Sequence, residues 1–97
     1  MTLFYVTYTM LPGQRDNFLE AVRSSGILDA IRREPGCLSY AYYLPEEEDG
    51  TLLLVEKWSD DQAQKEHLAT PHMAELAQLK PQYVAATAVI SWEAQDK

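Results

Sequence analysis

The chain has 97 residues, and its 8 Lys or Arg against 15 Asp or Glu give a formal net charge of −7. This length predicts a single small domain over residues 1–97, whose modest core would gain from a second subunit. The acidic balance argues against nucleic acid and anionic membrane surfaces as partners, because both select a basic patch.

The cellular setting follows from what the sequence lacks. A single cysteine, Cys37, excludes an internal disulfide and a cysteine-based metal cage. No segment has the length of a transmembrane helix, and no basic region followed by an apolar run opens the chain. We therefore expect a cytoplasmic protein with no membrane partner.

The first half of the chain predicts a strand followed by a broken helix. Alternating side chains predict the strand over residues 3–10, and helical spacing predicts a helix over 14–24 that resumes over 27–33. Pro-Gly pairs at 12–13 and 35–36 end the strand and the helix.

The centre of the chain predicts a β-hairpin. Residues 37–44 and 51–58 are rich in β-branched and aromatic side chains, and the acidic turn 45–50 joins them. Both faces of the strand 51–58 are mainly apolar, which predicts a cover on both sides. We expect helices on one side and a second subunit on the other.

The last part predicts two helical pieces and a final strand. Ser59 and Gln62 form a capping-box pattern for a helix over about 60–69, and Thr70-Pro71 is typical of the start of a second helix, ending before Pro81. A strand over 87–92 completes the order β-α-β-β-α-β. This order predicts an α+β, ferredoxin-like fold with an antiparallel sheet and helices on one face, whose open face pairs in a homodimer to form a dimeric α/β-barrel.

Several motifs within this framework resemble one protein family. They are Pro-Gly-Cys at 35–37 with Tyr40, Glu56-x-Trp58, His67, and Thr-Pro-His at 70–72. Together they resemble the antibiotic biosynthesis monooxygenase family, including its quinol monooxygenase-like members. The resemblance implies a dimeric α/β-barrel with a ligand pocket between the helices and the sheet. It also implies one of several activities: some members oxidise quinols or anthrones with molecular oxygen and no cofactor, some degrade haem, and some isomerise.

Two specialised branches of the family fit less well. The chain resembles the polyketide anthrone oxygenases at Trp58, but Leu54 and Gln64 stand where their strand asparagine and helix tyrosine are expected. The haem degraders use an asparagine on the first strand, and residues 3–10 contain none. The general quinol-oxidising pattern of one Glu, one Trp and two His remains.

Oxidising a quinol without a cofactor requires a base, because the deprotonated substrate is itself the reductant for oxygen. His72 is the predicted base: it is the second residue of a helix, where the helix dipole disfavours imidazolium. His67 and Glu56 are predicted to support it, with His67 either binding an anionic substrate or pairing with Glu56. Each of the three also has a purely structural interpretation. His72 would cap the first turn of its helix, His67 would be a cation at a helix C-terminus, and Glu56 would form a hydrogen bond that holds the fold.

The predicted substrate-binding residues lie on the central strands. Trp58 could form a wall that stacks on an aromatic ring, and Tyr40, Tyr42 and Leu54 complete the set, although strand aromatics are more often packing residues. No metal site is predicted, because His67 and His72 are five residues apart with a proline between them.

The leading hypothesis is a cofactor-independent monooxygenase that oxidises a quinol-like or polycyclic phenolic molecule with molecular oxygen. Three alternatives stay open: an isomerase that moves a proton on a small carbonyl compound, a non-catalytic small-ligand binding module, and a haem-binding protein with a histidine as axial ligand.

Overall fold

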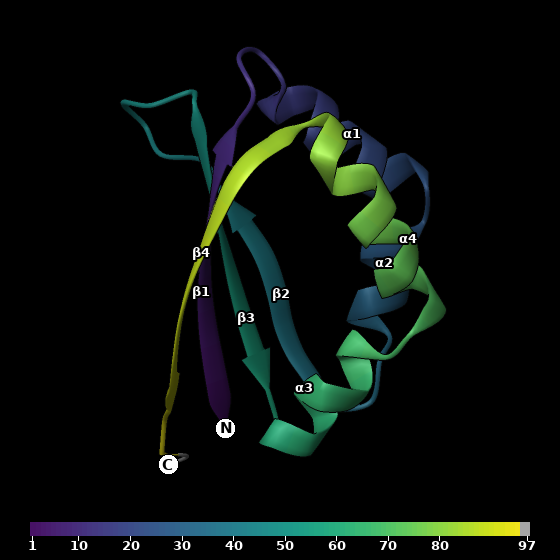
Figure 1. Cartoon of the computed structure of the whole chain (residues 1–97). Coiled ribbons are helices and arrows are strands. Elements are labelled where there is room, and N and C mark those ends of the chain that lie inside the picture. The colour runs from purple at the N-terminus through teal and green to yellow at the C-terminus, as the bar shows by residue number, and fades with distance from the viewer. Residues whose placement is uncertain (96–97) are drawn as a thin grey trace.

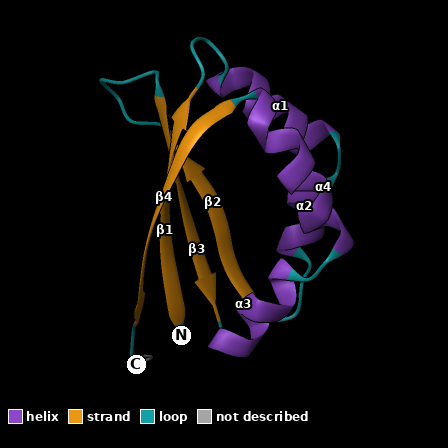
Figure 2. Ribbon diagram, in the orientation of Figure 1, coloured by secondary structure: helices purple, strands orange, loops and turns teal. Residues whose placement is uncertain are grey.

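The computed structural model describes residues 1–95. Its helices all lie on one side of a single twisted sheet, so that the molecule has two layers (Figures 1 and 2). Along the chain the elements are β1 Thr2–Met10, α1 Arg15–Ser24, α2 Ile27–Arg32, β2 Cys37–Tyr43, β3 Thr51–Trp58, α3 Asp61–Leu68, α4 Pro71–Leu79, the 3₁₀ turn η1 Lys80–Gln82, and β4 Val84–Glu93.

The sheet has the strand order β2-β3-β1-β4, and all three neighbouring pairs are antiparallel. The predicted α+β, ferredoxin-like β-α-β-β-α-β architecture is confirmed, with the helical part of each half divided into two pieces. None of the described helices has the length and apolar character needed to cross a membrane.

Two predicted boundaries were wrong. Asp60 rather than Ser59 caps α3: its side chain accepts a hydrogen bond from the Ala63 amide at 2.8 Å, since aspartate in an extended conformation is an equally good N-cap. The last strand starts at Val84, three residues before the predicted start. Pairing of Val84 and Ala86 with the end of β1 supplies the hydrogen bonds that the weak strand propensity of alanine does not predict.

Strand β3 is central and shows the expected alternation. Leu52, Leu54 and Trp58 on its helix-facing side are fully buried, whereas the residues between them are half-buried on the other side. The helices contribute Phe18, Leu19, Val22, Ile27, Leu28, Ile31 and Leu76 to the same core. The core therefore fills the space between the two layers except where a cavity remains near α3 and η1.

Candidate functional site

A cavity of about 260 Å³ lies between the helices and the sheet. Its wall is mainly apolar, with side chains from β1, β2, β3, β4 and the second helical pair. Five ionisable side chains interrupt this wall: Tyr8, Tyr40, Glu56, His67 and Lys80. An apolar hollow with a few convergent polar groups is the usual form of a small-molecule site.

Glu56 is the acidic group of the cavity. It lies on the helix-facing side of β3, two residues before Trp58, whose indole Nε1 donates a hydrogen bond to Glu56 Oε1 at 3.0 Å. Burial raises the pKa of Glu56 above its ordinary value, while the Trp58 hydrogen bond and the charges of His67 and Lys80 act in the opposite direction. A carboxyl in this setting is suited to hold and release a proton.

Because the pKa of Glu56 is raised, the free energy of unfolding should depend on pH. The folded protein binds this proton more tightly than the unfolded chain, so the contribution is fully present below the ordinary pKa of 4.5 and is lost as pH rises through the folded value. Glu56→Gln keeps an oxygen for Trp58 and removes the titration. As the pH rises from 4.5 to neutrality, we expect the free energy of unfolding to fall less for Glu56→Gln than for the wild type, as measured by urea unfolding at each pH. Equal losses in both proteins would contradict the burial of an ionisable Glu56.

Burial also raises the pKa of Tyr8 and of Tyr40. Both hydroxyls therefore stay protonated at physiological pH and are available as hydrogen-bond donors to an oxygen of a bound molecule.

Glu34 joins the two histidines. Its Oε2 lies 2.8 Å from His67 Nδ1 and 2.7 Å from His72 Nε2, although the three residues come from the α2–β2 turn, the end of α3 and the start of α4. The side chains of Glu34 and His67 are 9% and 1% exposed, so this pair is shielded from water, whereas His72 is 21% exposed. Hydrogen bonds to an ionised group in such a setting are strong.

The network fixes the tautomers of the imidazoles. An ionised carboxylate only accepts hydrogen bonds, so His67 carries a hydrogen on Nδ1 and His72 carries one on Nε2. In neutral His67 the second nitrogen, Nε2, is then an acceptor. Because His67 also lines the cavity, its carboxylate-oriented side chain borders any molecule bound there.

Two further contacts hold His67 in place. Its ring packs against the indole of Trp58, with centroids 4.5 Å apart and planes inclined by 37°. Thr70, the N-cap of α4, donates a hydrogen bond from its hydroxyl to the carbonyl of His67 at 2.8 Å, and its hydroxyl oxygen accepts one from Met73. Thr70 therefore ties the end of α3 to the start of α4, and with it the positions of both histidines.

Glu34, His67 and His72 are also of the types that bind metal ions, and their ligand atoms lie within 4.8 Å of one another. The observed separations of 2.7–2.8 Å between ring nitrogens and a shared carboxylate oxygen are hydrogen-bond distances. The geometry of this cluster is therefore that of a proton-sharing network.

The structure divides the residues selected from the sequence into two groups. Glu56, His67 and Tyr40 line the cavity, whereas His72, Trp58, Tyr42 and Leu54 are not among its lining residues. Among residues 1–95, Glu34 is the carboxylate hydrogen-bonded to both His72 and His67, and Glu56, one of the two partners suggested for His67, has no hydrogen bond to it. Trp58 lies behind the wall, fully buried between Glu56 and His67. Leu54 is a fully buried core residue, and the hydroxyl of Tyr42 is buried without a hydrogen-bond partner in the described part of the chain.

Sequence reasoning missed two charged residues of the site. Glu34 directly precedes the Pro35-Gly36 stop, where an acidic side chain is usually a solvated turn residue. Lys80 begins η1 and places its amine 5.5 Å from the centre of the Tyr8 ring. In both cases the available signal was a charged residue immediately before a proline.

Comparison with known proteins gives the family context of this site. The sequence profile of the antibiotic biosynthesis monooxygenase family matches residues 1–79. A protein of Synechocystis, named uncharacterized protein sll1783, is 33% identical over 79 residues, which are 81% of this chain and 52% of that protein. The chain therefore spans about half the length of this curated relative.

Solved structures with the same architecture cover almost the whole chain. A protein named antibiotic biosynthesis monooxygenase is 25% identical with a TM-score of 0.84, over 99% of this chain and all of its own. PA3566 from Pseudomonas aeruginosa is 20% identical with a TM-score of 0.84, over 98% and 94% of the two chains. Rv0793 from Mycobacterium tuberculosis is 24% identical with a TM-score of 0.82, over 99% and 96%. The profile match over most of the sequence, together with the fold, shows that the chain belongs to the antibiotic biosynthesis monooxygenase family.

Proposed function

We propose that the protein is a cofactor-independent monooxygenase that oxidises a small quinol-like aromatic molecule with molecular oxygen, in the cytoplasm. The observation that carries the proposal is the meeting of a carboxylate-oriented imidazole, a buried carboxyl and an amine at one apolar cavity. Membership of a family whose relatives include a protein named as a monooxygenase supports the same reaction class.

The size of the cavity favours a small substrate. Its volume of about 260 Å³ lies below the range of roughly 300–1,000 Å³ typical of sites for drug-sized ligands. A quinol of one or two rings therefore fits better than a polycyclic phenol of three or more rings.

In the proposed reaction His67 is the general base in place of His72. His67 Nε2 accepts the proton of a substrate hydroxyl while Glu34 stabilises the imidazolium through Nδ1. The resulting anion reduces oxygen and forms a carbon–oxygen bond, which gives a substrate hydroperoxide. Cleavage of its oxygen–oxygen bond releases water and leaves a hydroxylated quinone, so that four electrons pass from the quinol to one O₂.

Glu56 is the proposed acid for the last step. With Oε1 occupied by the Trp58 indole, its second oxygen can carry the proton that the departing oxygen takes as it becomes water. His72 and Trp58 act on the substrate through Glu34, Glu56 and His67, as positioning residues.

Oxygen consumption with reduced menadione under oxygen-18 gas tests this function. We expect a hydroxylated menadione that carries one heavy oxygen atom per O₂ consumed, at a rate well above that of the protein-free solution, in which the quinol is only dehydrogenated. If a panel of one-ring and two-ring quinols gives no incorporation above this background, the proposal is wrong.

An isomerase is the second candidate, because an acid and a base at the same cavity can also move a proton within a carbonyl compound. The two activities differ in their need for molecular oxygen. Turnover of a quinol that stops under argon supports the monooxygenase, whereas anaerobic conversion of an enolisable carbonyl compound supports the isomerase.

The proposal includes a homodimer formed by the open face of the sheet. Tyr5, Tyr43, Ile90 and Trp92 expose 41–66% of their surface, and Leu53 and Val55 are half-buried beside them. A hollow of about 360 Å³ lies on the same face, between Tyr5, Tyr43 and Val55. An apolar surface of this kind on a small domain favours a second copy of the same sheet.

Val55→Asp is expected to convert a dimer into a monomer, because the new charge would be buried in the centre of the interface without a partner. Light scattering after size-exclusion chromatography at micromolar concentration measures the mass. Gln78→Asp on the exposed side of α4 adds the same charge elsewhere and should leave the mass unchanged. A monomeric wild type, or a Val55→Asp protein that remains dimeric, would contradict the proposed interface.

A further inference from the structure

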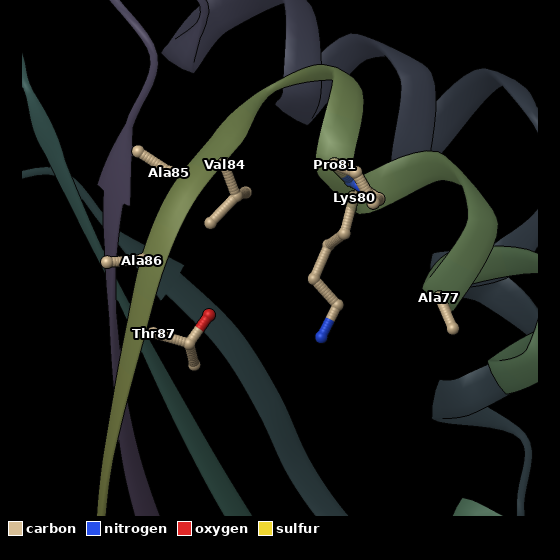
Figure 3. A pocket seen from close by; sticks show the side chains of 7 residues that line it. All are labelled: Ala77, Lys80, Pro81, Val84, Ala85, Ala86 and Thr87. Atoms are coloured by element: carbon tan, nitrogen blue, oxygen red, sulfur yellow. The ribbon is translucent and has the colours of Figure 1, made fainter.

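Lys80 lies at the boundary between two cavities. It lines the 260 Å³ cavity together with Glu56 and His67, and it also lines a second hollow of about 400 Å³ between η1 and the start of β4. Figure 3 shows its side chain extending from η1 into the space between α4 and β4, with the amine on the side of Thr87. Thr87 is the other residue that lines both hollows. A molecule that spans the two hollows, or passes from one to the other, therefore meets the amine of Lys80.

The amine of Lys80 is half-buried and makes no ion pair with another residue of the described part of the chain. Among residues 1–95 no carboxylate lies within 4.0 Å of Nζ, and the nearest specific contact is the face of the Tyr8 ring at 5.5 Å. Burial lowers the pKa of Lys80, although the charge of Glu56 acts against this effect. A partly desolvated cation that makes no ion pair is available to an anionic ligand, whose binding would offset the cost of its desolvation.

Lys80 is a positive charge within a strongly acidic protein. The chain carries a formal net charge of −7, so its overall field repels anions. Lys80 is the one Lys or Arg among the described residues that line either hollow. Lys80 is therefore the ammonium group that is placed to bind an anion at these hollows.

We infer that Lys80 binds the ionised oxygen of the substrate and so selects aromatic molecules with an acidic phenolic or enolic hydroxyl. Before the reaction the ammonium favours ionisation of that hydroxyl, and during the reaction it stabilises the anion that reduces oxygen. The choice of aromatic ligands rests on the proposed function, but anion binding by Lys80 does not require turnover.

Binding of an unreactive ligand pair tests the inference. The probe is 2-hydroxy-1,4-naphthoquinone, which is an anion at neutral pH, and its methyl ether is the neutral control of nearly the same shape. Calorimetric titration compares the wild type with Lys80→Met, Lys80→Arg and the exposed α3 variant Lys65→Met. The Lys80→Met protein lacks a charge-assisted hydrogen bond to the anion, so it should bind the anion about 10- to 100-fold more weakly than the wild type. Binding of the ether should change little, Lys80→Arg should keep part of the preference, and Lys65→Met should match the wild type.

The outcomes separate this inference from the proposed function. If Lys80→Met keeps the wild-type ratio of anion to ether affinity, or if the wild type does not bind the anion at millimolar concentration, Lys80 is not the anion-binding residue. Lys80-dependent binding of the anion without oxygen consumption by any quinol would uphold the inference and overturn the monooxygenase. Oxygen consumption by the wild type, combined with an unchanged ratio of anion to ether affinity in Lys80→Met, would support the monooxygenase and overturn the role of Lys80.

Discussion

His67→Asn is expected to lower oxygen consumption with a reduced naphthoquinone by about 10²- to 10⁴-fold, which is the usual contribution of a general base. The asparagine amide can replace Nδ1 as the donor to Glu34 but offers nothing in place of Nε2 at the cavity. The variant should therefore keep its fold, as measured by circular dichroism and urea unfolding, while losing the proton acceptor. Initial rates of oxygen uptake measure the effect.

Matched variants identify which histidine is the base. His72→Ala should cause a smaller loss than His67→Asn, because His72 is hydrogen-bonded to Glu34 and is not among the described residues that line the cavity. Lys65→Ala, exposed on the same helix as His67, should retain the wild-type rate. A near-normal His67→Asn enzyme combined with an inactive His72→Ala enzyme would return the role of base to His72, as the position of that residue in its helix suggested.

Gly36→Ala is expected to lower the free energy of unfolding by about 2–5 kcal/mol, the sum of a left-handed backbone penalty and overpacking. Gly36 has φ of +83°, and a Cβ there would lie 2.5 Å from Ala63 Cβ and 2.7 Å from Ser59 Oγ. The Gly36 carbonyl also accepts the Ser59 amide at 2.8 Å, so the start of β2 and the start of α3 cannot move apart freely. Urea unfolding of the two proteins measures the difference.

Gly13→Ala is the control for this close approach. Gly13 has φ of +73°, but a Cβ added there would have no atom within 4 Å beyond its chain neighbours, so alanine carries the backbone penalty alone, about 1–2 kcal/mol. Equal losses for the two variants would mean that crowding at Gly36 is unimportant. A larger loss for Gly36→Ala should be accompanied by weaker activity, because the same turn carries Glu34 to the histidines.

The element order could be predicted because each strand and helix carries its own periodicity. Strand β3 illustrates this: its boundaries and its alternating faces follow from eight consecutive residues. Glu56 was also detectable, since a carboxylate on an apolar strand face must be paired or protonated wherever the strand packs. The N-cap of α3 was misplaced by one residue because Ser59 and Asp60 are both good capping residues and only their backbone angles separate them.

The network around Glu34 could not be predicted from local pattern. Glu34 lies 33 residues from His67 and 38 from His72, and the contact exists only after α2, α3 and α4 have packed together. The helix-dipole argument that favoured His72 considers one helix at a time. Burial and proximity to the cavity, which favour His67, are properties of the whole fold, and the same is true of Lys80.

The central claim is that a flat aromatic molecule binds between β3 and α3, against His67. A crystal structure with 2-hydroxy-1,4-naphthoquinone bound tests this claim most directly. The account predicts the ring in the 260 Å³ cavity, with its atoms within about 4 Å of the His67 imidazole. A ligand found only on the open face of the sheet, or a cavity filled by protein side chains, would contradict it.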